Sequence, residues 1–259
     1  MERRSFRDEI AKNKRSSLFL AVLVAAVLIL LVYFFTWIFA PEYSLIVLPF
    51  TILFIALYTY GSYMYGDSIV LSATNAQPTE GPQYQYLRDT VEGASIAAGI
   101  PPPKVYVMEN SEINAYATGR DPEHASIAVT TGAMRELSRA ELEGVVAHEV
   151  SHVRNRDILF MTLVAVLVGL VAILSHIILR TFRYGGIQRE RRGRGRGERG
   201  GGIEALILVL GFVLAIFAPI AVRLVQLALS RRREYLADAS GAELTRYPEG
   251  LASALEKIM

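Results

Sequence analysis

The sequence predicts an α+β domain, mainly helical with a small sheet, that is joined to about four transmembrane helices. Two observations predict this class. Four apolar runs of about 20 residues are each long enough to cross roughly 30 Å of hydrocarbon. Between the second and third runs, a polar stretch alternates between helical and strand patterns. The chain has no cysteine, which excludes disulfides and cysteine nucleophiles.

The four apolar runs define the membrane part of this prediction. They cover residues 18–40, 44–64, 158–179 and 203–222. The first run is too long for a signal peptide and no small-residue cleavage site follows it, so we expect it to remain as an anchor. One such run is also typical of a buried core helix, whereas four together favour a multi-pass membrane protein.

The predicted spans divide the chain into four regions. Residues 1–65 form an N-terminal cytoplasmic segment and a transmembrane hairpin, and residues 66–157 form a cytoplasmic, candidate catalytic region. Residues 158–222 form a second transmembrane hairpin, whose connecting loop at 180–202 is rich in Arg and Gly. Residues 223–259 return to the cytoplasmic side and complete the candidate catalytic region.

Charge sets the expected topology. Six Lys and Arg residues precede the first span, so the N-terminus is expected in the cytoplasm. Eight arginines in the outer loop oppose this rule, against eleven basic residues on the predicted cytoplasmic side. The sequence therefore leaves open whether spans three and four fully cross. The expected location is the cell (plasma) membrane, with the polar regions facing the cytoplasm.

The polar stretch contains its own predicted elements. A helix is expected over 83–98, stopped by Gly99 and a Pro run, followed by strands at 104–108, 113–117 and 125–130. Ser138 and Glu141 form a capping box that starts the next helix. An apolar stripe predicts one buried face for this helix, with its histidines on a polar side. A last helix is expected to start near Pro248.

The helix that follows the capping box carries the most informative motif, His148-Glu149-Val150-Ser151-His152. Two histidines four residues apart lie one turn above each other on a helix, so both can hold one zinc ion. Glu149 lies beside them, where a carboxylate can act as a base on water at the metal. The simpler interpretation is a surface helix with two ordinary histidines.

A zinc site of this kind needs a third protein ligand. Histidine further along the same helix is excluded, because Asn155 and Ile158 occupy the positions of that alternative motif. Glu234 is a candidate, with Asp238 four residues later placed to accept a hydrogen bond from a ligand histidine. The pair could equally neutralise the three preceding arginines on a surface, and spacing alone does not decide.

These motifs resemble the HtpX-type membrane zinc endopeptidases, gluzincins related to the CAAX prenyl endopeptidases. The resemblance rests on the histidine motif, the segment Arg232 to Ala242 and the segment Ile113 to Gly119, in the family's order. It implies an α+β zincin-like catalytic domain, one Zn²⁺ per subunit, Glu234 as third ligand and Asp238 behind the ligands. Family members usually continue past Met259, so a short variant or a truncated chain is expected.

The resemblance and the motifs together predict a zinc metalloendopeptidase acting near the cytoplasmic membrane surface. Glu149 is the expected catalytic base, and Asn114 and Ala115 are expected to bind substrate by backbone pairing. Expected partners are polypeptides, chiefly membrane or misfolded proteins in quality control and stress response, and the lipid bilayer, without nucleic acid. His124 is expected to be an ordinary exposed residue.

Two alternatives stay open on sequence grounds. A protease acting within the bilayer would carry the histidine motif inside an apolar span, and the charged residues around this motif argue against that. A non-enzymatic membrane scaffold would use a structural metal site, and its Arg/Gly loop would contact lipid or RNA. The presence of Glu149 disfavours the scaffold, because a structural site has no use for a base.

Overall fold

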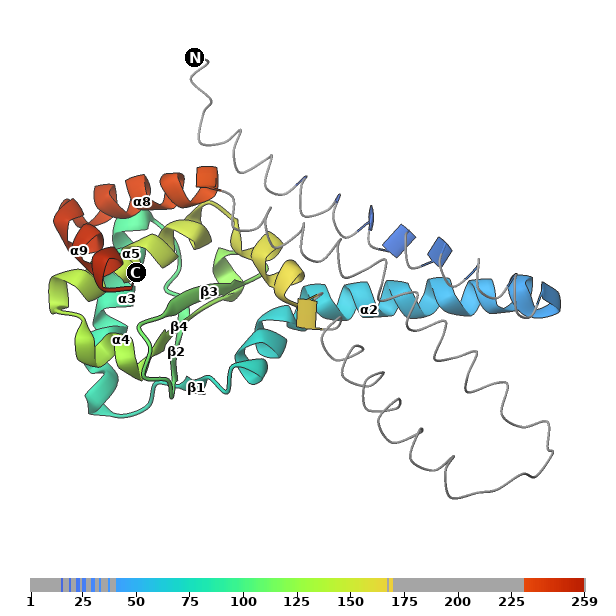
Figure 1. The fold of residues 1–259 in the computed structure, drawn as a ribbon, viewed down its shortest axis with the longest axis horizontal. Helices are drawn as coiled ribbons and strands as arrows, with labels where there is room; N and C mark the ends of the chain where they lie inside the picture. Colours follow the sequence, from blue (N-terminus) through green and yellow to red (C-terminus); the bar gives the residue numbers. More distant parts are fainter. Residues whose placement is uncertain are drawn as a thin grey trace, which may run out of the picture. The chain divides into compact units, whose positions relative to one another are not determined.

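A computed structural model describes residues 41–166, 168–169 and 231–258, together with ten separate positions between 15 and 37 that are all helical. Of these, residues 57–163 and 231–258 belong to one compact unit, and residues 41–56 belong to a second unit. The sheet and all the candidate site residues lie in the first unit (Figure 1).

A four-stranded mixed sheet forms the centre of the first unit. Its strands are β1 (Gln77–Pro78), β2 (Lys104–Met108), β3 (Ala115–Gly119) and β4 (Ala125–Thr130), in the order β1-β2-β4-β3. β2 and β4 are parallel, and the two outer strands run antiparallel to their neighbours. Every residue of β4 is buried, which agrees with its central position and its short apolar sequence.

The two faces of the sheet are covered by different elements. Ile127 and Val129 of β4 pack with α3 (Gln85–Ala98) and α5 (Arg139–Arg154) in the main core. Ala128, between them in sequence, points to the other face, where it packs with Met108 and with Leu71 of α2 (Ser44–Ala73). This alternation follows the two-residue period of a strand.

α5 is the helix that carries the histidine motif, and its predicted capping box is confirmed. The side chain of Ser138 accepts a hydrogen bond from the backbone N–H of Glu141, and the Glu141 carboxylate accepts one from the backbone N–H of Ser138. The expectation of a single buried face was wrong. α8 (Arg231–Thr245) and α9 (Pro248–Ile258) pack over the remaining surface of α5, so that eleven of its sixteen residues are buried.

α9 packs against the N-terminal half of α5 at very short range. A Cβ on Gly144 would lie 2.6 Å from the backbone nitrogen of Leu251, so only glycine permits this approach. Polar side chains also stabilise the packing of α9 on α5. The buried Glu141 carboxylate accepts hydrogen bonds from Ser253 Oγ at 2.6 Å and Lys257 Nζ at 2.7 Å. One residue thus caps α5 and binds α9.

Several predicted boundaries differ from the structure. The chain enters α3 through a 3₁₀ turn, η2 (Pro82–Tyr84), and leaves it at Gly99 in the left-handed conformation that ends helices. β3 starts at Ala115 rather than at residue 113, because Thr130 binds the backbone of Asn114. Two further 3₁₀ turns, η1 (Pro41–Tyr43) and η3 (Pro122–His124), a short helix α4 (Thr131–Glu136) and a helical segment at residues 158–166 are also described.

α2 is the one described helix that is long and apolar enough to span a membrane. It runs nine residues past the predicted end of the second span, since Leu71 near its C-terminal end joins the core of the sheet. The span predicted at 203–222 and the loop at 180–202 lie outside the described residues. The same holds for most of the span at 18–40 and for half of the span at 158–179, so about four membrane helices stays a prediction.

The Glu141 cluster generates a prediction about stability and pH. Hydrogen bonds from Lys257, Ser253 and Ser138 lower the pKa of Glu141 from 4.5 to about 2. Because the folded state favours the charged carboxylate, its stabilisation is complete above about 4.5 and is lost as the pH falls towards 2. Glu141→Gln should therefore lower the thermal midpoint in detergent at pH 7, and this deficit should shrink as pH 2 is approached.

Glu256→Gln is the matched control, because Glu256 is an exposed residue of α9 next to Lys257. It should leave the midpoint unchanged across the same pH range. A Glu141→Gln midpoint equal to wild type at pH 7 would contradict the anchoring role.

Candidate metal centre

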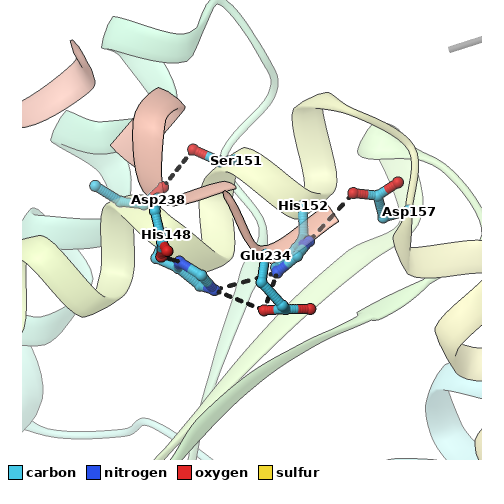
Figure 2. A network of polar contacts seen from close by, with 7 residues as sticks. His148, Ser151, His152, Asp157, Glu234 and Asp238 are labelled. Carbon is cyan, nitrogen blue, oxygen red and sulfur yellow. Dashed lines mark hydrogen bonds and ion pairs between the residues drawn. The ribbon is translucent and has the colours of Figure 1, made fainter. Parts of the chain in front are cut away.

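Three side chains from two helices converge on one point. His148 and His152 lie one turn apart on α5, and Glu234 approaches them from the first turn of α8 (Figure 2). The two Nε2 atoms are 3.2 Å apart, and Glu234 Oε2 lies 3.5 Å from His148 Nε2 and 3.7 Å from His152 Nε2. The structure thus brings together the three residues that the sequence predicted as ligands.

The close approach of α8 to α5 makes this convergence possible. A Cβ on Gly241 would lie 3.1 Å from the backbone nitrogen of His148, so glycine lets the two backbones come together beside the histidines. Glu234 and Asp238, four residues apart on α8, then both face His148. Asp238 therefore lies beside a histidine of the motif, where its spacing of four residues from Glu234 suggested.

Each imidazole lies against its own carboxylate. Nδ1 of His152 is hydrogen-bonded with Asp157 Oδ2 at 3.2 Å, whereas Nδ1 of His148 lies 2.9 Å from Asp238 Oδ1 without hydrogen-bond geometry (Figure 2). A carboxylate at Nδ1 favours the tautomer that carries hydrogen there and leaves a lone pair on Nε2. Both Nε2 lone pairs therefore point towards the Glu234 carboxylate, an arrangement that is repulsive unless a cation or protons lie between them.

The triangle of ligand atoms fits a zinc ion. Zinc bonds of about 2.0 to 2.1 Å at tetrahedral angles place neighbouring ligand atoms about 3.3 to 3.4 Å apart. The three separations of 3.2, 3.5 and 3.7 Å lie close to this spacing. Two imidazoles and one carboxylate are also a common protein donor set for catalytic zinc, which leaves a fourth position for water.

Asp157 is the site residue that sequence reasoning missed. Its side chain is fully buried, five residues after His152 and beyond the end of α5. The chain turns at Arg156, whose φ of 58° is left-handed, and the backbone N–H of Asp157 donates to the carbonyl of His152 at 3.1 Å. No spacing rule used on the sequence identifies this turn. An acid between the end of the histidine helix and the apolar run that follows was the available signal.

Glu149 is buried between α5 and β3, with 8% of its surface exposed. Burial raises the pKa of Glu149, while His152, His148 and a hydrogen bond from the backbone of Ala117 act in the opposite direction. A carboxylate with a raised pKa accepts a proton more readily than a free one, which suits a general base. The Ala117 contact ties this side chain to the strand.

The charges of the ligand residues are strongly coupled. Hydrogen bonds from His148 and His152 lower the pKa of Glu234 to about 2. Burial alone would lower the pKa of His152, but hydrogen bonds to Asp157 and Glu234 outweigh it and raise the pKa to about 10. His148 shows the same balance, with a raised pKa due mainly to Glu234. Without metal, the site therefore holds protons at pH 7.

The two adjacent residues predicted to bind substrate direct their backbones to opposite sides of the strand. The backbone of Asn114 faces into the sheet: its N–H donates to Thr130 Oγ1 and its carbonyl accepts from the N–H of Thr130, both at 3.0 Å. In an antiparallel ladder the next residue points the other way, so Ala115 directs its backbone away from β4. Only Ala115 of the predicted pair offers main-chain groups at the edge of the sheet.

A second cluster of possible ligands lies at η3, where Asp121, Glu123 and His124 come together. Asp121 caps this turn and contacts His124 Nδ1 at 2.7 Å, and nearly half of the His124 side chain is exposed. The cluster is therefore accounted for as a capped surface turn, and the expectation of an exposed His124 is confirmed.

Comparisons with known proteins agree with this geometry. The model of Peptidase family M48 matches residues 82–259. A protein named Protease HtpX homolog from Thermoanaerobacter pseudethanolicus is 43% identical over 258 residues, covering 100% of this chain and 84% of that protein. The namesake from Dictyoglomus turgidum is 42% identical over 254 residues, covering 98% and 79%.

A solved structure shows the same fold. The crystal structure of S. mikatae Ste24p matches with a TM-score of 0.52 and 18% sequence identity. The match covers 96% of this chain and 58% of that chain. At this identity the likeness concerns the fold alone.

The coupled charges predict that zinc uptake releases protons. Metal ligands must bind through deprotonated atoms, and His152 in the metal-free site titrates near 10. Zinc binding at pH 7 should release about one to two protons per ion, fewer as the pH rises towards 10. Calorimetric titration in buffers of different ionisation enthalpy measures this number, and binding without proton release at pH 7 would contradict the charge state.

Asp157 provides a second prediction. Asp157→Asn keeps the shape of the side chain but removes the charge that holds hydrogen on Nδ1 of His152. Zinc affinity should fall roughly 10- to 100-fold, as for other partners of metal-bound histidines. Competition with a chelator of known affinity measures the change. Asp89→Asn, an exposed position on α3, should bind zinc as wild type does.

Proposed function

The chain belongs to peptidase family M48 and is a metalloendopeptidase, and we propose that its metal is one zinc ion held by His148, His152 and Glu234. The observation that supports this best is the triangle of two Nε2 atoms and one carboxylate oxygen at 3.2 to 3.7 Å. Asp157 is hydrogen-bonded with the His152 ring, and the Asp238 carboxylate lies 2.9 Å from Nδ1 of His148, which favours the tautomer that this ligation requires.

Glu149 is the proposed catalytic residue for proton transfer. Zinc bound at the site would polarise the scissile carbonyl and lower the pKa of water. Glu149 takes the proton from the attacking water and delivers it to the leaving amine. Its burial and raised pKa support this role, as does its position between the histidines and β3. A scaffold with a structural metal would gain nothing from a buried carboxylate at this place.

The substrate is proposed to lie extended along the edge of β3. Among the described strands, β3 ends the sheet, with β4 on its other side. Ala115 presents its N–H and carbonyl at this edge. It lies two residues before Ala117, whose backbone is hydrogen-bonded with Glu149. Main-chain pairing reads little of the side-chain sequence, so broad specificity towards unfolded polypeptides follows.

We place this activity at the cytoplasmic surface of the cell membrane, on membrane or misfolded proteins in quality control. The apolar part of α2 supports membrane attachment, with Phe50 and Phe54 about 70% exposed. Tyr60, Tyr63 and Tyr65 follow on the same helix and are also exposed. Exposed aromatic residues next to an apolar span are typical of the membrane interface.

Two substitutions separate metal binding from catalysis. Glu149→Gln should retain one zinc per chain but lower kcat on an unfolded protein such as casein by about 10²- to 10⁴-fold, the usual contribution of a general base. Glu234→Ala should lose zinc together with activity, because two histidines alone hold the ion weakly. Metal analysis and cleavage assays on detergent-purified protein measure both quantities.

Glu243→Gln is the control, since Glu243 is an exposed acid on α8 away from the ligand triangle. It should match wild type in zinc content and cleavage. Full activity of Glu149→Gln would remove this residue from the mechanism, and undiminished zinc in Glu234→Ala would show that the third ligand lies elsewhere.

A further inference from the structure

The outward-facing backbone positions of β3 differ in what they contact. Residues 114, 116 and 118 pair towards β4, and Ala115, Ala117 and Gly119 face away from it. Within the described part of the chain, no hydrogen bond is made to the main-chain groups of Ala115 at this edge. The backbone of Ala117 makes a hydrogen bond with Glu149. Gly119 is bonded on both of its main-chain groups by a single side chain, that of Thr162.

Thr162 occupies the far end of this edge. Its Oγ1 accepts a hydrogen bond from the N–H of Gly119 at 3.0 Å and lies 3.3 Å from the Gly119 carbonyl, to which it can donate. The same atom lies 2.8 Å from Thr118 Oγ1. Both threonine side chains are almost completely buried. A hydroxyl group thus takes the place that a paired strand would occupy beside Gly119.

Two features make this end of the edge rigid. Thr162 lies in the first turns of the helix at residues 158–166, just after Asp157, which orients His152. Gly119 has φ of +139°, and a Cβ there would lie 2.3 Å from the carbonyl oxygen of His124, so only glycine fits at this position. The edge therefore ends where Thr162 closes it.

We propose that Thr162 is a specificity-determining residue that closes one end of the substrate-binding edge. The inference rests on the proposed function, in which an extended peptide pairs with β3. Gly119 lies two residues beyond Ala117, about 7 Å along the strand. A bound peptide can pair beside Ala115 and Ala117, but on the Gly119 side it must leave the sheet within about two residues of the catalytic base.

A peptide series tests this closure. Fluorogenic peptides are extended one residue at a time on either side of the scissile bond, and kcat/KM is measured with the zinc-loaded full chain in detergent. On one side, wild-type kcat/KM should stop rising after about two residues. Thr162→Ala frees the N–H and carbonyl of Gly119. The next residue added on that side should then raise kcat/KM by about two- to tenfold, the contribution of one backbone hydrogen bond.

Thr162→Ser is the matched variant, because it keeps the hydroxyl group, and it should preserve the wild-type dependence on length. Amide hydrogen exchange adds a readout that needs no substrate: the Gly119 N–H should be protected in wild type and Thr162→Ser and lose protection in Thr162→Ala. A wild-type kcat/KM that keeps rising on both sides would overturn the closure, as would equal length dependence in Thr162→Ala and wild type.

Binding of the same peptides to the Glu149→Gln variant separates this inference from the proposed activity. Suppose that wild type cleaves no peptide, but that the affinity of Glu149→Gln stops rising with peptide length on one side and rises further when Thr162→Ala is added. The proposed catalytic function then fails and the closed edge stands. If peptides are cleaved but their affinity ignores Thr162, the closed edge fails alone. Absence of peptide binding in every variant would overturn the closed edge as a substrate site.

Discussion

The convergence of three electron-rich atoms at one point is the constraint on which the rest of the site depends. Two imidazole nitrogens and a carboxylate oxygen within 3.2 to 3.7 Å repel each other in the absence of positive charge. The fold holds them there through the close packing of α5 and α8 at Gly241. This repulsion lowers the stability of the metal-free fold, a common cost of a functional site, and it favours binding of a cation.

Buried charges elsewhere in the unit follow the same requirement for partners. Glu141 is neutralised by Lys257 and capped by Ser138, and each histidine has a carboxylate behind it. Burial of unpaired charge is very unfavourable. α5 can therefore be enclosed almost completely although it carries two histidines and two buried acids. The cluster that fastens α9 and the cluster that orients the ligands lie at opposite ends of one helix.

The sequence predicted features that depend on short-range spacing. The capping box at Ser138, the strands at 104–108 and 125–130, and the meeting of His148, His152 and Glu234 all follow from local periodicity or from family resemblance. Contacts that depend on a change of chain direction after a helix were missed. Asp157 returns to His152 only through the left-handed turn at Arg156.

One error has the same origin. The apolar stripe of α5 suggested a solvated side because α8 and α9, distant in sequence, supply its cover. The alternation of an antiparallel ladder also gives Asn114 and Ala115 opposite backbone orientations, which the sequence prediction did not distinguish. That alternation also explains how so short a strand serves three purposes. Its inward positions complete the sheet, the backbone of Ala117 contacts Glu149, and Ala115 is the position that the proposed function leaves for substrate. β3 has only five residues, so closing its end beside Gly119 removes few backbone positions that could pair with a peptide. In the proposed arrangement, the closed end fixes where a bound peptide lies relative to Glu149.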